Sequence, residues 1–161
     1  MNRWLVGILA LSLIWPWPAI ALDLQGLYEQ ALSASRSGDF VQALPLWDRV
    51  LEQSPRDAAA LSNRGNVRLA LGDLDGAIED QTRSIELAPD EADPHLNRGT
   101  AEEALQDWPA AAADYLWILE RQPDDASALY NLGNTHFNEQ DYEEAKQRYF
   151  QTQKFADNNS S

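Results

Sequence analysis

Few side chains in this sequence could perform acid–base or nucleophilic chemistry. The 161 residues include two histidines, His95 and His136, and no cysteine, so thiolate nucleophiles, thiolate metal sites and disulfides are excluded. His95 stands beside Pro94 at an expected helix start, and neither histidine has a second one at metal-ligand spacing. We therefore predict that both histidines are structural, that the chain is not an enzyme, and that it holds no cofactor and no metal.

The acidic and polar residues indicate binding more than catalysis. The stretch Asp73-Leu74-Asp75-Gly76 lacks the further oxygen ligands of a calcium-binding loop, and no serine elbow or phosphate loop is found. Asparagines recur instead at residues 63, 97 and 131, and amides that both donate and accept suit the backbone of an extended polypeptide. A hydrolase or metal binder built on the acids remains the least favoured alternative.

The charge balance excludes further function classes. Twelve Lys and Arg residues stand against 26 Asp and Glu, which gives a net charge of −14. Nucleic acids and anionic membrane surfaces are bound through clustered basic residues, so neither is an expected partner. The apolar share of 44 % is nevertheless high enough for a packed core.

The first 21 residues have the order of a secretory signal peptide. A short basic start at residues 1–3 precedes an apolar run at residues 4–15, two prolines and the small-x-small sequence Ala19-Ile20-Ala21. We predict cleavage after Ala21 and a single domain at residues 22–161 with no direct membrane binding. An uncleaved anchor is the alternative, but a membrane span needs about 20 apolar residues.

The remaining sequence repeats with a period of 34 residues. Small residues, aspartates and prolines recur at this spacing, as in Ala31, Gly65, Gly99, Gly133; Ala43, Ala77, Ala111, Ala145; Asp39, Asp73, Asp107, Asp141; and Pro55, Pro89, Pro123. The units therefore cover residues 24–57, 58–91, 92–125 and 126–159, which leaves no room for a second domain.

Each unit is predicted to be a pair of helices. In the second unit we expect helices at residues 59–71 and 74–87, joined at Gly72-Asp73 and ended by Pro89. The repeated aspartate is expected to cap the second helix. The small residues, one on each helix, predict close packing of the two backbones that larger side chains would break.

The residues at the remaining positions of each unit complete a pattern that resembles the tetratricopeptide repeat (TPR) family. It is carried by Leu129-x-x-Leu132-Gly133, Tyr142, Ala145 and Tyr149 in the fourth unit, and by Trp108, Ala111, Tyr115 and Pro123 in the third. The resemblance implies an all-α, right-handed solenoid of four helix-turn-helix units, whose first helices line a concave groove. It also implies protein binding, and it puts His136 where a packing tyrosine is usual.

A narrower resemblance concerns location. The Asn-x-Gly openings of units two to four and the run Ala110–Ala113 are similar to small exported TPR proteins of cyanobacteria and of the thylakoid lumen. This similarity implies the periplasm or the thylakoid lumen as the compartment, with secretion as the alternative.

The residues expected to line the groove are the predicted partner-binding residues. On the face of each first helix that points away from its hairpin partner lie mostly amides, hydroxyls and aromatic rings, namely Tyr28, Asn63, Asn66, Asn97, Thr100, Tyr130, Asn131, Asn134 and Phe137. Alternatively, the asparagines hydrogen-bond helix ends or neighbouring helices. The Lys/Asn/Arg set with which some TPR domains clamp a C-terminal carboxylate is absent, because Tyr28 and Leu32 occupy its first two positions.

Two arginines occupy a position where the family pattern has an apolar residue. Arg64 and Arg98 each have an aspartate sixteen residues later, whereas the fourth unit has Leu132 there and Arg148 opposite. Because the charges change together, we predict the inter-helix ion pairs Arg64–Asp80 and Arg98–Asp114, with Glu102 as a competing partner of Arg98. In the alternative, both arginines extend into solvent.

The leading functional hypothesis is an exported scaffold or assembly factor whose groove binds an extended polypeptide in a periplasmic or lumenal complex. The alternative is a self-associating structural module that uses the end of the solenoid. Late in the last helix an apolar pair of the inner units becomes Thr152-Gln153, which predicts a self-capping end. We expect a mostly monomeric protein with weak end-to-end association.

Overall fold

The predicted all-α fold is confirmed. The computed structural model describes residues 17–158, with side chains placed for residues 24–154. The helices within these residues are α1 (Trp17–Arg36), α2 (Phe40–Gln53), α3 (Ala58–Leu71), α4 (Leu74–Leu87), α5 (Ala92–Ala104), α6 (Trp108–Arg121), α7 (Ala126–Asn138) and α8 (Tyr142–Asn158). The second unit differs from the predicted helix bounds only by one residue at the start of α3.

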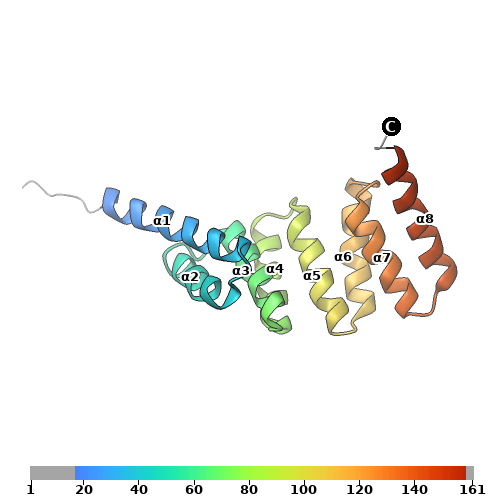
Figure 1. Ribbon diagram of the computed structural model, residues 1–161, viewed down its shortest axis with the longest axis horizontal. Helices are drawn as coiled ribbons and strands as arrows, with labels where there is room; N and C mark the ends of the chain where they lie inside the picture. Colours follow the sequence, from blue (N-terminus) through green and yellow to red (C-terminus); the bar gives the residue numbers. More distant parts are fainter. Residues whose placement is uncertain (1–16, 159–161) are drawn as a thin grey trace, which may run out of the picture.

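The helices pack in chain order as four hairpins in a row (Figure 1). Each helix contacts the next along the chain, and α3 also contacts α1 and α5, which in turn contacts α7. The even-numbered helices within the described residues make no such contacts with one another. The odd-numbered helices therefore form the inner, concave surface, and the even-numbered helices are spread along the outer one.

Repeated aspartates fix where the outer helices begin. The Asp39, Asp73 and Asp107 carboxylates accept hydrogen bonds from the backbone N–H three residues later, at 3.2, 3.1 and 3.3 Å, as predicted. Two further caps were not predicted from the sequence: Asp57 and Asp125 accept in the same way at the starts of α3 and α7. These bonds satisfy backbone donors that have no partner inside the helix.

One position in each tight turn adopts the left-handed backbone conformation. In the first two units it is glycine, with φ of 77° at Gly38 and 82° at Gly72. In the last two units it is Gln106 and Gln140, with φ of 64° and 67°. Glycine adopts this conformation without a steric cost, whereas a residue with a Cβ adopts it at a cost in free energy.

The glycines of the inner helices permit close packing of each hairpin. A Cβ added at Gly99 would lie 2.7 Å from a Tyr115 ring carbon, and one at Gly133 would lie 2.7 Å from the Tyr149 ring. At Gly65 the facing atom is Nε2 of Gln81, also at 2.7 Å. This geometry agrees with the small side chains that the sequence analysis requires at this position.

The core changes character along the solenoid. An apolar cluster around the fully buried Trp47 holds units one and two, and a second cluster around Tyr115 holds units three and four. Between them, the buried side chains of α4 other than Ala77 are polar, namely Asp80, Gln81 and Ser84. The Ser84 hydroxyl donates to the Ala58 carbonyl at 2.8 Å, so hydrogen bonds between buried polar groups help to hold α3 and α4 together here.

The N-terminal helix extends beyond the first repeat unit. Helix α1 begins at Trp17 and runs continuously past Ala21, the predicted cleavage point, into the first unit. The rest of the predicted signal peptide, residues 1–16, lies outside the described residues. Among the helices of residues 17–158, none combines the length and apolar character needed to cross a membrane.

Candidate peptide-binding groove

Three hollows lie along the inner helices and contain several predicted site residues. Asn63 and Asn66 line two of them, one of about 370 Å³ toward the start of α5 and one of about 280 Å³ toward the end of α1. Asn134 and Phe137 line a third hollow, of about 330 Å³, where α5 and α7 end. The hollows are open to solvent, so the inner surface offers separate side-chain subsites rather than one deep cavity.

The asparagine row is only partly available to a ligand. The Asn66 carbonyl oxygen accepts from Nε2 of Gln81 at 2.9 Å, and that of Asn134 accepts from the Tyr149 hydroxyl at 2.8 Å. Asn63 uses its amide nitrogen on the Ala59 carbonyl at 2.9 Å, one turn back. Each of these side-chain amides therefore makes one hydrogen bond within the protein. The amide nitrogen of Asn66 and of Asn134, and the carbonyl oxygen of Asn63, are left to contact a ligand.

The remaining polar members of the row are half-buried on the inner helices. Asn97 and Asn131 are both partly exposed. Thr100 donates its hydroxyl to the Leu96 carbonyl of its own helix at 2.9 Å, so its oxygen still accepts. These three residues line none of the three hollows.

The aromatic candidates differ in exposure. Tyr130 and Phe137 on α7 are 51 % and 54 % exposed. Tyr28 on α1 instead packs edge-on against Trp47 with ring centroids 4.9 Å apart, and burial is the main cause that raises its pKa above 10.0. A ligand would thus meet exposed rings mainly on the fourth unit.

The predicted pair Arg64–Asp80 is confirmed, and it belongs to a larger network. Two nitrogens of Arg64 contact the two Asp80 oxygens at 2.8 and 2.6 Å, and the third donates to Asp48 at 2.8 Å. Arg68 contacts the same Asp80 carboxylate at 3.0 Å. The Asp80 side chain is 1 % exposed, so its charge is compensated by two arginines inside the protein.

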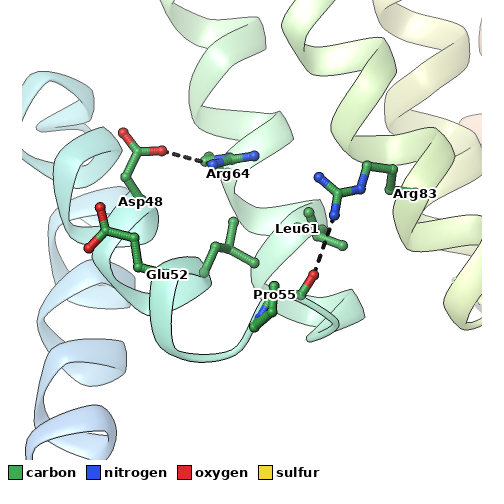
Figure 2. Close-up of a pocket in the computed structure, with 7 residues that line it drawn as sticks. Asp48, Glu52, Pro55, Leu61, Arg64 and Arg83 are labelled. Carbon is green, nitrogen blue, oxygen red and sulfur yellow. Dashed lines mark hydrogen bonds and ion pairs between the residues drawn. The ribbon is translucent and has the colours of Figure 1, made fainter.

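The outer side of this network borders another hollow, of about 360 Å³ (Figure 2). Asp48 and Glu52 from α2 and Arg83 from α4 enter it from opposite sides, and Arg64 lies between them. Since charges of both signs already face each other there, the hollow offers no excess charge for a ligand.

The second predicted pair, Arg98–Asp114, is also confirmed. Nε and a terminal nitrogen of Arg98 donate to the Asp114 carboxylate at 2.7 and 2.8 Å. Nδ1 of His95 lies 2.7 Å from the same carboxylate, and the imidazole stacks on Trp117 at a centroid distance of 3.8 Å. This buried position agrees with the structural role predicted for His95.

Glu102 contacts this network only loosely. Its carboxylate lies 3.9 Å from Nε of Arg98, and its second oxygen is buried with no hydrogen-bond partner. Burial, reinforced by the negative charge of Asp114, raises the pKa of Glu102 to about 7, although Arg98 acts in the opposite direction. Glu102 is therefore a weaker partner than Asp114 for the Arg98 guanidinium.

Glu103 joins units three and four and was not predicted from the sequence. Its two carboxylate oxygens accept hydrogen bonds from the hydroxyls of Tyr115 on α6, at 3.1 Å, and Thr135 on α7, at 2.9 Å. Burial is the main cause that raises the pKa of Tyr115, and the Glu103 charge adds to it, so this tyrosine stays a donor near neutral pH. No spacing regularity marks Glu103, because the contact to Thr135 exists only between units.

Comparison with known proteins gives a consistent result. A sequence profile described as "Tetratricopeptide repeat" matches residues 28–92 and 96–159. Tetratricopeptide repeat protein 36 of Danio rerio is 33 % identical over 63 residues, which are 39 % of this chain and 34 % of that protein. The chain thus matches about a third of the length of this relative.

Solved structures share the fold at lower identity. "MamA 41-end from Desulfovibrio magneticus RS-1" superimposes with a TM-score of 0.81 at 18 % identity, covering 86 % of this chain and 78 % of that one. The first TPR of Spaghetti (RPAP3), bound to the HSP90 peptide SRMEEVD, has a TM-score of 0.68 at 22 % identity, with coverage of 71 % and 91 %. At these identities the likeness concerns the fold.

Proposed function

The chain belongs to the tetratricopeptide repeat family, and from this premise we propose that its concave surface binds an extended polypeptide, as an exported scaffold or assembly factor. Members of this family are typically scaffolds without enzymatic activity. The observation that carries the proposal is the set of hollows on the inner helices, which contain Asn63, Asn66, Asn134 and Phe137.

The arrangement of polar groups suits an extended chain. Half-buried amides and hydroxyls recur on consecutive inner helices, and several of the amides line the hollows. A peptide backbone offers donors and acceptors at regular spacing, and its side chains need separate recesses. The exposed rings of Tyr130 and Phe137 add apolar contact area at one end of this surface.

A ligand with a clamped C-terminal carboxylate is not proposed for this groove. Tyr28 packs against Trp47, and Leu32 packs against the apolar core cluster at the positions where a carboxylate clamp has its first two members. The solved neighbour bound to SRMEEVD accordingly serves as a precedent for peptide binding, and its ligand is not transferred to this chain.

Export is part of the same proposal and rests on the sequence of residues 1–21. The basic start, the apolar run and the Ala19-Ile20-Ala21 ending support cleavage before Leu22 and a role in the periplasm or the thylakoid lumen.

A crosslinking pull-down from the native envelope tests the groove. We expect the wild type to capture a defined polypeptide and the double variant Asn63→Ala/Asn97→Ala to lose most of it. A matched control is Gln53→Ala/Gln151→Ala, which removes two exposed amides from the outer helices α2 and α8. Equal capture by all three proteins would contradict a role for the groove.

Self-association is the second candidate and is favoured by one observation. Phe150 on α8, the last outer helix described, is 71 % exposed. Light scattering over a range of concentrations separates the two candidates. A monomer that captures a polypeptide supports the groove, whereas a concentration-dependent dimer without a captured partner supports the solenoid end.

A further inference from the structure

The hollow at the ends of α5 and α7 has a chemistry that differs from the rest of the groove. It is lined by Glu103, Ala104, Trp108, Asn134, Phe137 and Asn138. The lining therefore combines one carboxylate with two aromatic side chains and two amides. Phe137 is 54 % exposed, and its ring contacts Tyr142 at a centroid distance of 5.4 Å, so the aromatic wall is accessible and supported.

The carboxylate of Glu103 is held in a fixed position. The Tyr115 hydroxyl donates to one oxygen, and the Thr135 hydroxyl lies 2.9 Å from the other, with its single proton shared between Glu103 and the Asn131 carbonyl at 3.0 Å. Both donor residues are fully buried. Since these donors come from α6 and α7, both rotation of the carboxylate and its withdrawal from the hollow are restrained by two neighbouring helices. A group held in this way binds a ligand without a large loss of side-chain entropy.

Glu103 carries its charge without a cationic partner among the described residues. The ion pairs found in this part of the chain engage other carboxylates, including Asp48, Asp80 and Asp114, and none includes Glu103. The two hydroxyls that contact it are neutral, so they orient the negative charge without compensating it. The net charge of −14 also favours the approach of a cationic partner over an anionic one.

We propose that this hollow binds the basic side chain, lysine or arginine, of the extended polypeptide that occupies the groove. The cation would pair with the Glu103 carboxylate and lie against the Trp108 and Phe137 rings, because aromatic faces attract cations. Asn134 and Asn138 would contact the neighbouring backbone. The inference rests on the proposed groove function and specifies in addition that one residue of the bound polypeptide is positively charged.

Peptide selection provides the test. The full-length chain is used to select from a display library of random twelve-residue peptides, in parallel with Glu103→Gln and the control Glu79→Gln, an exposed glutamate on the outer helix α4. The best peptide is then synthesised with lysine or its uncharged analogue norleucine at the enriched basic position, and affinities are measured calorimetrically.

We expect enrichment of peptides with a basic residue by the wild type and by Glu79→Gln. The change from lysine to norleucine should weaken wild-type binding about tenfold or more, as for loss of a charge-assisted hydrogen bond, and should have under about twofold effect on Glu103→Gln. Phe137→Leu, at an exposed position, should reduce the preference for lysine without unfolding the chain, and thermal melting checks the fold of each variant.

The possible failures are distinguishable. If the wild type enriches no peptide at all, the proposed groove function is wrong and the inference falls with it. If peptides are enriched without a basic residue, or if norleucine binds the wild type as well as lysine, the groove function stands and the cationic subsite is wrong. The norleucine comparison on the wild type decides the matter even if Glu103→Gln does not fold.

Discussion

Replacing Glu102 by glutamine should stabilise the protein, and the gain should depend on pH. The Glu102 side chain is 13 % exposed, one of its oxygens has no hydrogen-bond partner, and its nearest cation, Arg98, is engaged by Asp114. The uncharged glutamine amide has nearly the same shape. It would remove the cost of holding a second negative charge beside the Asp114 carboxylate.

The size of the effect follows from the pKa of Glu102. Burial raises this pKa from 4.5 to about 7 in the folded protein, whereas the unfolded chain keeps the ordinary value. Each pH unit between the two values corresponds to about 1.4 kcal/mol, so the upper limit is about 3 kcal/mol. Because the side chain retains some contact with water, we expect about 1–3 kcal/mol at pH 8.

The sign of the pH dependence is fixed by the direction of the shift. Below pH 4.5 the carboxyl is protonated in both states, so it contributes no penalty. As pH rises from 4.5 to about 7, the unfolded chain ionises this carboxyl while the folded protein keeps it protonated, so the wild type loses stability relative to the variant. Above about 7 both states are ionised, and the difference stays constant. The advantage of Glu102→Gln should therefore grow from near zero at pH 4.5 to its full value at pH 8.

Urea unfolding followed by circular dichroism at pH 5, 6, 7 and 8 measures this difference. Glu79→Gln is the matched control, since it removes an exposed carboxylate and should change stability by less than about 0.5 kcal/mol at every pH. A difference between Glu102→Gln and wild type that is constant over this pH range, or a variant that is less stable at pH 8, would refute the reasoning.

Three further predictions concern other parts of the chain. In a double-mutant cycle of Arg64→Leu and Asp80→Asn, urea unfolding should give a coupling energy above about 1 kcal/mol, because a buried ion pair with two contacts exceeds the median for exposed ion pairs. Additive effects of the two substitutions would contradict this. Gln106→Gly should raise stability by about 1 kcal/mol in thermal melts by relieving its positive φ, whereas Gln151→Gly, inside helix α8, should lower it by about the same amount. Mass analysis of protein from the native envelope should show an N-terminus at Leu22, and an intact precursor would overturn the expected cleavage.

The 34-residue period by itself determined most of the fold. Once the period was recognised, the position of Gly72-Asp73 gave the turn, and the helices of the second unit followed to within one residue. The pairs Arg64–Asp80 and Arg98–Asp114 were accessible for the same reason. Their members are sixteen residues apart within one hairpin, and that offset gives the same contact in units two and three.

Contacts between units required the tertiary structure. The same sixteen-residue offset joins Arg64 to Asp48 of the preceding unit, and Glu103 reaches Thr135 in the following one. Which side chains meet across such a boundary depends on the rotation from one unit to the next. Sequence spacing does not encode that rotation.

Burial and the choice among competing partners were also decided only in three dimensions. The sequence offered Arg98 both Asp114 and Glu102, and the structure places Arg98 Nε 2.7 Å from the first and 3.9 Å from the second. Burial, reinforced by the Asp114 charge, raises the pKa of Glu102. Glu103, one residue later, instead accepts hydrogen bonds from two hydroxyls at the edge of the groove. These outcomes depend on side-chain rotamers and local desolvation, because electrostatic energy varies steeply with distance and with access of water.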